Sequence, residues 1–206
     1  MSDRKTHWDN IYKDKGADEV SWFQPKPDLS LKLIENSKTD QAEAILDVGG
    51  GLSRLVDHLF DDGFSRLAVL DISAHAISST RQRLGKKALN IEWFAQDILE
   101  FETDHKFSLW HDRAVFHFLT RKEDREQYVN ILRAALKNNG QLIIAAFAIG
   151  GPEKCSGLEI VQYDAVKLQA ELGDHFELLE QQSEVHVTPS SVKQQFTYFR
   201  FIHKVE

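Results

Sequence analysis

Three aspartates stand out because each lies at the end of a short apolar run. Asp47, Asp71 and Asp97 close the segments 44–48, 66–73 and 91–98. An ionised carboxylate only accepts hydrogen bonds, so Asp71 could hold both hydroxyls of a ribose. Aspartate after a strand is also a common turn former, but three in succession are more specific. Because ligands of open α/β sheets bind at the carboxyl ends of strands, these acids predict a site for a nucleoside-bearing cofactor.

A run of glycines strengthens this prediction. Gly49, Gly50 and Gly51 directly follow the first acidic strand, and a helical pattern of apolar residues begins at Leu52. Glycine permits the tight turn and lets a ligand lie against bare backbone. The dinucleotide fingerprint requires a third glycine where this chain has Arg54, and no phosphate-binding Gly-Lys-Ser/Thr follows. An NAD-dependent reductase is therefore disfavoured.

The acid, the glycine turn and the later strand-end acids together resemble the class I (seven-β-strand, Rossmann-like) S-adenosylmethionine-dependent methyltransferases. The chain is similar to a small bacterial-type, single-domain member across nearly its whole length. The resemblance implies S-adenosylmethionine as cofactor and S-adenosylhomocysteine as product. It also implies that Asp97 accepts from the adenine amino group and that residues 107–119 border the methionine part. The cofactor-binding residues expected on this basis are Asp47, Gly49, Gly50, Gly51, Asp71, Ile72, Asp97, Ile98, Asp112 and Arg113.

Catalytic and acceptor residues follow from the same resemblance. His117 matches a position where many members carry histidine beside the acceptor, although it fits a core position equally well. His117 and Asp112 are the expected bases if the acceptor must lose a proton. Trp22, Phe23 and His117 form the expected acceptor pocket, whereas Trp8 and Tyr12 are interpreted as packing.

Other reactive side chains receive no role. His111 is interpreted as structural, and Cys155 as non-catalytic because a sulfonium already carries an excellent leaving group. The histidines show no recognised metal-ligand spacing, so no metal is expected.

The acceptor class stays open at this point. The stretches 8–12 and 22–23 resemble the N-terminus of seven-strand lysine methyltransferases, but Asp112-Arg113-Ala114 departs from their Asp-Lys-Gly. A small-molecule acceptor is slightly favoured over a protein lysine. The alternative is a non-catalytic cofactor-binding module of the same fold.

The elements that position these residues alternate between strand and helix patterns. This alternation predicts an α/β fold: a doubly wound, mostly parallel seven-stranded sheet with helices on both faces and a C-terminal antiparallel strand pair. Further strands are expected at 107–111, 141–147, 176–180 and 196–203. Helices are expected at 3–13, 29–35 (capped by Asp28), from 52 onward, at 74–84 (capped by Ser73), 122–137 and 163–172.

One domain over residues 1–206 is expected. It comprises an N-terminal helical segment (1–40) over the cofactor and acceptor site, a cofactor-binding core (41–147), and a closing part (148–206). In the closing part, the loop 148–158 is either a lid or a plain connector.

Composition narrows the partners. The net charge of −7 argues against a nucleic-acid partner, and Arg81, Arg83, Lys86 and Lys87 are interpreted as a solvated helix face. No apolar run reaches the roughly 18 residues of a membrane span, and no signal peptide is expected. With one cysteine, no internal disulfide is possible, and a cytoplasmic location is expected. The expected partner is a small-molecule or protein acceptor; the oligomeric state stays open.

Overall fold

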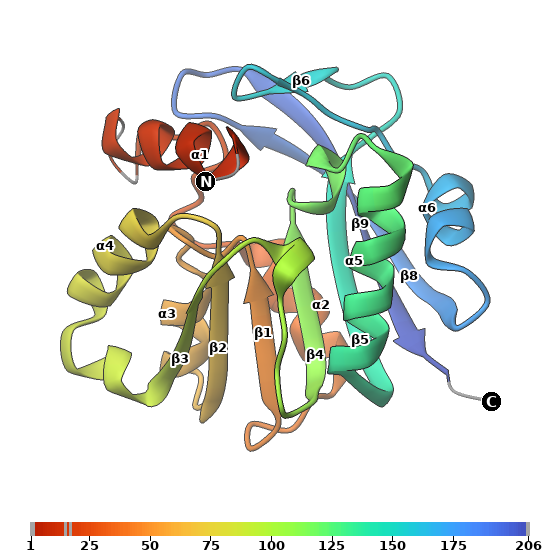
Figure 1. Cartoon of the computed structure of the whole chain (residues 1–206), viewed down its shortest axis with the longest axis horizontal. Helices are drawn as coiled ribbons and strands as arrows, with labels where there is room; N and C mark the ends of the chain where they lie inside the picture. The colour runs from red at the N-terminus through yellow and green to blue at the C-terminus, as the bar shows by residue number, and fades with distance from the viewer. Residues whose placement is uncertain (1–2, 15, 17, 205–206) are drawn as a thin grey trace.

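The computed structural model describes residues 3–14, 16 and 18–204, and its centre is a seven-stranded sheet (Figure 1). The strands lie in the order β3-β2-β1-β4-β5-β9-β8. Neighbours from β3 to β5 run parallel, whereas β9 is antiparallel to both β5 and β8. The predicted fold class is confirmed. The strand bounds are β1 Ala44–Val48, β2 Arg66–Asp71, β3 Ile91–Ala95, β4 Phe107–Arg113, β5 Leu136–Phe147, β8 Phe176–Val187 and β9 Lys193–His203.

Helices cover both faces of the sheet (Figure 1). Side chains alternate along a strand, so β1 sends Ile45 to one face and Leu46 to the other. Ile45 joins the cluster with α2 (Asp28–Ser37) and α3 (Leu55–Asp61). Leu46 joins the cluster with α5 (Lys122–Ala135) and α6 (Ala165–Leu172). The same alternation applies to β4, where neighbouring side chains point to opposite faces of the sheet. The remaining elements are α4 Ala74–Leu84, the short 3-10 helices η1 Gly85–Asn90, η2 Ile98–Glu100 and η3 Phe116–Phe118, and the small hairpin β6 Lys154–Cys155 with β7 Leu158–Glu159.

The N-terminal helix α1 (Asp3–Asp14) lies at the edge where β1 and β2 end, beside α4 (Figure 1). Lys5 Nζ donates to the carbonyl of Ile72 over 3.0 Å, and Ser73 Oγ donates to Asp9 Oδ1 over 2.5 Å. The two residues bonded to α1, Ile72 and Ser73, directly follow the last residue of β2. The helix is thereby fixed over the end of the strand that carries Asp71.

Several predicted boundaries need correction. Strand β5 begins at Leu136, so Asn138-Asn139-Gly140 lies inside a strand and does not end α5. Asn139 has a positive φ of 58°, and the register between β4 and β5 shifts nearby. Helix α3 begins only at Leu55. Asp28 is the first residue of α2 and not its cap, which is Pro27 without a side-chain hydrogen bond.

The predicted start and end of helix α4 are confirmed. Ser73 caps it by accepting from the amide of Ala76, and Gly85 follows its last residue with a φ of 57°. The last two strands are longer than predicted because β8 and β9 pair along almost their whole length, from Phe176 with His203 to Val187 with Lys193. Within the described ranges, no helix is long and apolar enough to cross a membrane.

Candidate functional site

A cavity opens at the carboxyl edge of the parallel strands, where ligands of such sheets bind. It holds about 840 Å³ of empty space, its open mouth included. The ends of β1, β2 and β4, the segment after β3, and α1 all contribute to its wall. Its lining is formed by Arg4, Trp8, Tyr12, Trp22, Val48, Gly49, Leu70, Asp71, Ile72, Gln96, Asp97, Ile98, Arg113, Ala114, Val115, Phe118, Leu119, Cys155, Gln194 and Phe196.

The glycine turn fits its place only without side chains. Gly49 has a φ of +69°, and its amide donates to the carbonyl of Leu70 over 2.7 Å. A Cβ on Gly49 would lie 2.2 Å from Val115 Cγ2, and one on Gly51 would lie 2.4 Å from Asp71 Oδ2. Gly49 lines the cavity, whereas Gly50 and Gly51 lie behind it and hold the turn against the acids.

Asp71, an acid of the cavity wall, accepts hydrogen bonds from two backbone amides. Its Oδ2 accepts from the amide of Gly51 over 3.0 Å and its Oδ1 from the amide of Ser73 over 2.8 Å. Burial, opposed by these two bonds, raises the pKa of Asp71 from 3.8 to about 6, and the charges of Asp47 and Asp9 add to the rise. Each carboxylate oxygen keeps a lone pair for a further donor.

Asp97 lies farther along the same wall, between Gln96 and Ile98. Its Oδ1 accepts from the amide of Leu99 over 3.1 Å, so it caps η2. Arg4 of α1 approaches Asp97 Oδ2 to 3.9 Å. Ile72 and Ile98 line the cavity beside these acids. The expected cofactor residues from β2 and β3 therefore lie together on one wall.

A second, more polar cavity adjoins the first. The two share Trp22, Val48, Gly49 and Arg113, and the second holds about 490 Å³ of empty space. Its lining is formed by Val20, Trp22, Phe23, Gln24, Pro27, Ser30, Asp47, Val48, Gly49, Leu52, Ser53, Arg54, Leu55, His111 and Arg113.

Asp47 lies in the wall of this second cavity, under the glycine turn. Its Oδ1 lies 2.7 Å from His111 Nδ1, and the other ring nitrogen, Nε2, lies 2.9 Å from Ser30 Oγ. All three side chains are buried. Asp47 Oδ2 has no hydrogen-bond partner among the described residues. A buried carboxylate oxygen without a partner is costly, so it marks a place for a donor.

Arg113 carries a buried donor that lacks a hydrogen bond among the described residues. Its Nε donates to Tyr198 Oη over 2.8 Å and its Nη1 to the carbonyl of Trp22 over 2.9 Å. The guanidinium also lies over the ring of Phe196, 4.8 Å from its centroid. Nη2 is buried without a hydrogen bond in the part of the chain that the structure describes; Glu184 Oε2 is 3.9 Å away.

Aromatic rings form one wall of the first cavity. Trp8, Tyr12 and Trp22 pack together, with centroid separations of 5.8–6.0 Å, and Phe118 lies 5.0 Å from Trp8. Hydrogen bonds from His186 Nε2 and Arg113 Nη1 to the carbonyls of Ser21 and Trp22 hold the segment that carries Trp22. Phe23, the other expected acceptor residue, lines only the second cavity.

The two expected bases lie outside both cavities. Asp112 follows His111 and therefore points to the opposite face, where Tyr128 of α5 donates to Oδ2 over 2.6 Å and the amides of Val115 and Phe116 also donate. Burial raises the pKa of Asp112 to about 6 despite these bonds.

His117 is buried against the rings of Phe118 and Phe147. Burial, followed by the charge of Arg113, lowers the pKa of His117 from 6.5 to about 3, so it is neutral at physiological pH. Neither nitrogen of its ring has a partner among the described residues. These placements give Asp112 and His117 no direct approach to a ligand.

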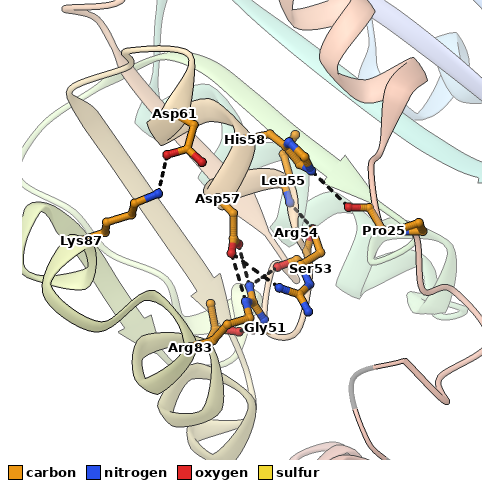
Figure 2. Close-up of polar contacts among 11 residues, drawn as sticks. Pro25, Gly51, Ser53, Arg54, Leu55, Asp57, His58, Asp61, Arg83 and Lys87 are labelled. Carbon is orange, nitrogen blue, oxygen red and sulfur yellow. Dashed lines mark hydrogen bonds and ion pairs between the residues drawn. The ribbon is translucent and has the colours of Figure 1, made fainter.

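The outer side of the glycine turn is fastened to α4 by Arg83 (Figure 2). Arg83 forms two bonds to Asp57 of α3, of 2.7 and 3.1 Å, and donates to the carbonyl of Ser53 over 2.7 Å. Thr80 Oγ1 donates to the carbonyl of Gly51. The prediction that Arg83 belongs to a solvated face is therefore wrong, because its side chain is only 18% exposed. The contact of His58 Nε2 with the carbonyl of Pro25, at 3.1 Å, ties α3 to the N-terminal segment in the same region (Figure 2).

Several residues of the cavity wall were not predicted from sequence. Trp8 and Tyr12 carried a signal, since residues four apart share one helix face, but that signal does not distinguish packing from a binding wall. Phe196 and Cys155 come from the closing part of the chain and reach the cavity only through the fold. Burial raises the pKa of the Cys155 thiol. Across the described ranges, no group of three or more His, Cys, Asp or Glu residues is arranged to hold a metal ion.

Comparisons with known proteins agree with this architecture. A family model described as a methyltransferase domain matches residues 46–142. The EEF1A lysine methyltransferase 2 of Danio rerio is 30% identical over 157 residues, which cover 69% of this chain and 67% of that protein.

Two solved structures share the fold at lower identity. The N-methyltransferase NodS of Bradyrhizobium japonicum, in complex with S-adenosylhomocysteine, has a TM-score of 0.71 and 19% identity, covering 95% of this chain and 97% of that one. A SAM-dependent methyltransferase of Anabaena variabilis has a TM-score of 0.77 and 15% identity, covering 99% and 96%. The sheet order, the glycine turn, the strand-end acids and these matches lead to one conclusion: the chain belongs to the class I, seven-β-strand family of S-adenosylmethionine-dependent methyltransferases.

Proposed function

We propose that this methyltransferase transfers the methyl group to the nitrogen of an alkyl amine, presented by a small molecule or by a lysine side chain. The observation that carries this proposal is the aromatic wall of the first cavity, formed by Trp8, Tyr12, Trp22 and Phe118. Aromatic ring faces attract ammonium groups and their methylated forms. An amine that gains a methyl group gains or keeps a positive charge, which such a wall favours.

The cavities fit the two ends of S-adenosylmethionine. Asp71 would accept from the ribose hydroxyls, and the wall with Asp97, Ile72 and Ile98 would hold the base. The second cavity offers one buried acceptor, Asp47 Oδ2, and one buried donor, Arg113 Nη2, both without a hydrogen bond among the described residues; Arg113 Nη2 also lies 3.9 Å from Glu184 Oε2. An α-amino-acid group carries the complementary ammonium and carboxylate. Each of these two atoms therefore has a suitable counterpart in this cofactor.

The cofactor, when bound, would supply a methyl group on a sulfonium, which an acceptor can attack directly with the thioether as leaving group and no covalent intermediate on the protein. The chain's own contribution is then placement and exclusion of water. Helix α1 and the segment around Trp22 form the roof, and most of the lining is apolar. In this proposal, the described part of segment 1–40 covers the site and residues 41–147 hold the cofactor. Segment 148–206 completes the acceptor wall through Cys155 and Phe196.

Three side chains of the described lining, Tyr12, Cys155 and Asp71, are poorly suited to take a proton from an alcohol. Burial raises the pKa of Tyr12 well above its ordinary value and also raises that of Cys155, and Asp71 is engaged by two amides. An amine can release its proton to water and enter the cavity neutral. We therefore expect the rate of methyl transfer to rise with pH until the free amine predominates.

The zebrafish relative is named a lysine methyltransferase, which supports nitrogen as the acceptor atom. The small-molecule preference expected from Asp112-Arg113-Ala114 is not strengthened by that relative. A free amine and a lysine side chain offer the same terminal group, so the aromatic wall fits both sources equally.

The experiment uses labelled S-adenosylmethionine and matched acceptors. Hexylamine, hexanol and hexanethiol test the acceptor atom, and Nα-acetyl-lysine amide and a lysine-containing peptide test its source. We expect methyl transfer to the amines alone, with product mass and fragmentation locating the methyl group on nitrogen. Transfer to the alcohol or thiol in preference to the amine would overturn the proposal. Binding of S-adenosylmethionine without transfer to any acceptor would favour a non-catalytic cofactor-binding module.

A further inference from the structure

We infer that His111 is a positioning residue for the amino-acid end of the cofactor, and that it acts as the middle of a buried chain formed by Ser30, His111 and Asp47. This inference rests on the proposed binding of S-adenosylmethionine across both cavities. It assigns a role to a histidine that the sequence alone indicates only as structural. The role is to hold one oxygen of Asp47 so that the other is left to accept from the cofactor.

The register of the sheet builds the chain. In the pairing of β1 with β4, Asp47 lies directly opposite His111, and both side chains point to the face that carries α2. Ser30 lies in the first turn of α2 and reaches the far side of the same ring. The distances are 2.7 Å from Asp47 Oδ1 to Nδ1 and 2.9 Å from Nε2 to Ser30 Oγ. All three residues line the second cavity.

The hydrogen-bond pattern sets the donor at each link. An ionised Asp47 can only accept, so His111 Nδ1 carries the hydrogen toward it. In the neutral ring, Nε2 then accepts from the hydroxyl of Ser30. The chain thus satisfies both nitrogens of a buried ring and one oxygen of a buried acid. It leaves Asp47 Oδ2 as the atom without a partner in the described structure.

The position of that atom connects the chain to the glycine turn. A Cβ on Gly50 would lie 2.5 Å from Asp47 Oδ2, so the oxygen is in close contact with the turn. Without the donor from His111, the buried Asp47 would lose its side-chain hydrogen bond among the described residues and would no longer be held in one orientation. The cofactor's ammonium would then lack a fixed acceptor at this place. The nucleoside wall around Asp71 and Asp97 would not be altered.

The second link explains why α2 takes part. Ser30 follows the segment that supplies Val20, Trp22 and Pro27 to the same cavity. The hydroxyl fixes the ring plane of His111, and through it the direction of Nδ1. Loss of Ser30 should therefore weaken the positioning without removing the donor to Asp47.

The test compares two ligands on three variants and the wild type by calorimetric titration. S-adenosylhomocysteine has the amino-acid end, whereas 5′-methylthioadenosine has the nucleoside and sulfur without it. His111→Asn places an amide nitrogen near the position of Nδ1 and keeps the donor to Asp47. His111→Gln places it near Nε2 and removes that donor, and Ser30→Ala removes only the outer link.

We expect His111→Gln to weaken S-adenosylhomocysteine binding by about tenfold or more, as for loss of a hydrogen bond to a charged group. His111→Asn and Ser30→Ala both keep a donor to Asp47 and lose the link through Ser30. Each should weaken S-adenosylhomocysteine binding by less than half as much as His111→Gln on a logarithmic scale. 5′-Methylthioadenosine should bind all four proteins alike. The ratio of the two affinities is thus the diagnostic quantity, because a general loss of folding lowers both.

Equal weakening for both ligands, or equal affinity of His111→Gln and wild type for S-adenosylhomocysteine, would overturn the inference. A failure of the proposed function is distinguishable from these results. In that case the wild-type protein itself would bind neither S-adenosylhomocysteine nor 5′-methylthioadenosine.

Discussion

Asp71 combines two properties that oppose each other. Burial raises its pKa to about 6, yet two backbone amides and, in the proposed complex, the ribose hydroxyls favour its ionised form. A carboxylate with this pKa loses its charge in mildly acidic solution. Cofactor binding should therefore depend on pH near this value.

We predict that the affinity for S-adenosylhomocysteine falls as the pH is lowered through about 6, because protonation of Asp71 replaces an acceptor by a neutral acid. Asp71→Ala should weaken binding by about 1.5–3 kcal/mol at neutral pH and remove this step of the pH profile. Calorimetric titration from mildly acidic to neutral pH measures both. An unchanged affinity in Asp71→Ala would contradict the ribose assignment.

Asp112 shows the same rise in pKa in a structural setting. Its pKa is about 6 in the folded protein and 3.8 as an ordinary group, so the folded state binds the proton more tightly. The stability that this group contributes is fully present below about pH 4 and is lost as the pH rises through about 6. By linkage, the contribution of Asp112 to the free energy of unfolding changes by at most about 3 kcal/mol across this pH range.

Asp112→Asn cannot titrate, so we predict that the difference in unfolding free energy between wild type and variant changes across this window. The wild type should gain stability relative to the variant as the pH falls from about 6 to about 4. Urea denaturation at several pH values measures the difference. Parallel curves for the two proteins would show that the folded-state pKa of Asp112 is ordinary.

At the scale of elements, the glycine turn is held from two sides. Inside, its amides bond to Leu70 and Asp71; outside, Arg83 of α4 bonds to Asp57 and to the carbonyl of Ser53. The guanidinium makes this connection because its donors are arranged in a planar fork. Lysine offers charge at this place but cannot form the same three bonds.

We predict that Arg83→Met lowers the free energy of unfolding by about 1–2 kcal/mol, and that Arg83→Lys restores less than half of this loss. The matched control is Lys87→Met, since Lys87 of η1 pairs with Asp61 of α3 at a more exposed place nearby and should change stability by less than about 0.5 kcal/mol. Denaturant midpoints compare the three variants. Full rescue by lysine would show that charge alone carries the contact.

The roof segment around Trp22 is the second element with a testable role. Its backbone is held by Arg113 and His186, and Gln24 donates to Glu184 over 3.0 Å. Trp22→Ala should lower methyl transfer by about tenfold or more through loss of aromatic wall, while Trp22→Phe keeps most of the rate. Initial rates with the amine acceptor measure this, with S-adenosylhomocysteine affinity as the control. Equal rates in Trp22→Ala and wild type would remove Trp22 from the acceptor wall.

The strand-end acids could be predicted from the sequence because each belongs to the same local pattern: an apolar run, an acid, then a turn. It also reveals the glycine turn, whose tight contacts with Val115 and Asp71 exclude other residues. The direction of Asp112 was not predictable at this level. Alternation along β4 sends His111 toward α2 and Asp112 toward α5, and which face holds the cavity depends on the assembled sheet.

At the scale of the whole molecule, the site joins parts that are far apart in the sequence. Arg113 of β4 links Trp22 near the N-terminus with Tyr198 of β9, and the Ser30–His111–Asp47 chain links α2, β4 and β1. No local pattern contains these contacts, because they follow from the sheet order and register. The aromatic roof has the same origin: α1 covers the site through bonds to the residues that follow β2 and through ring contacts with Trp22 and Phe118.

In the proposed complex, S-adenosylmethionine lies across both cavities, with its nucleoside at Asp71 and its amino-acid end at Asp47. The most direct measurement is calorimetric titration of the wild type, Asp71→Ala and Asp47→Asn with S-adenosylmethionine, and in parallel with NADH. We predict affinity in the micromolar range for the wild type, a loss of about tenfold or more in each variant, and no binding of NADH. Binding of NADH, or undiminished binding of S-adenosylmethionine by both variants, would contradict this placement of the cofactor.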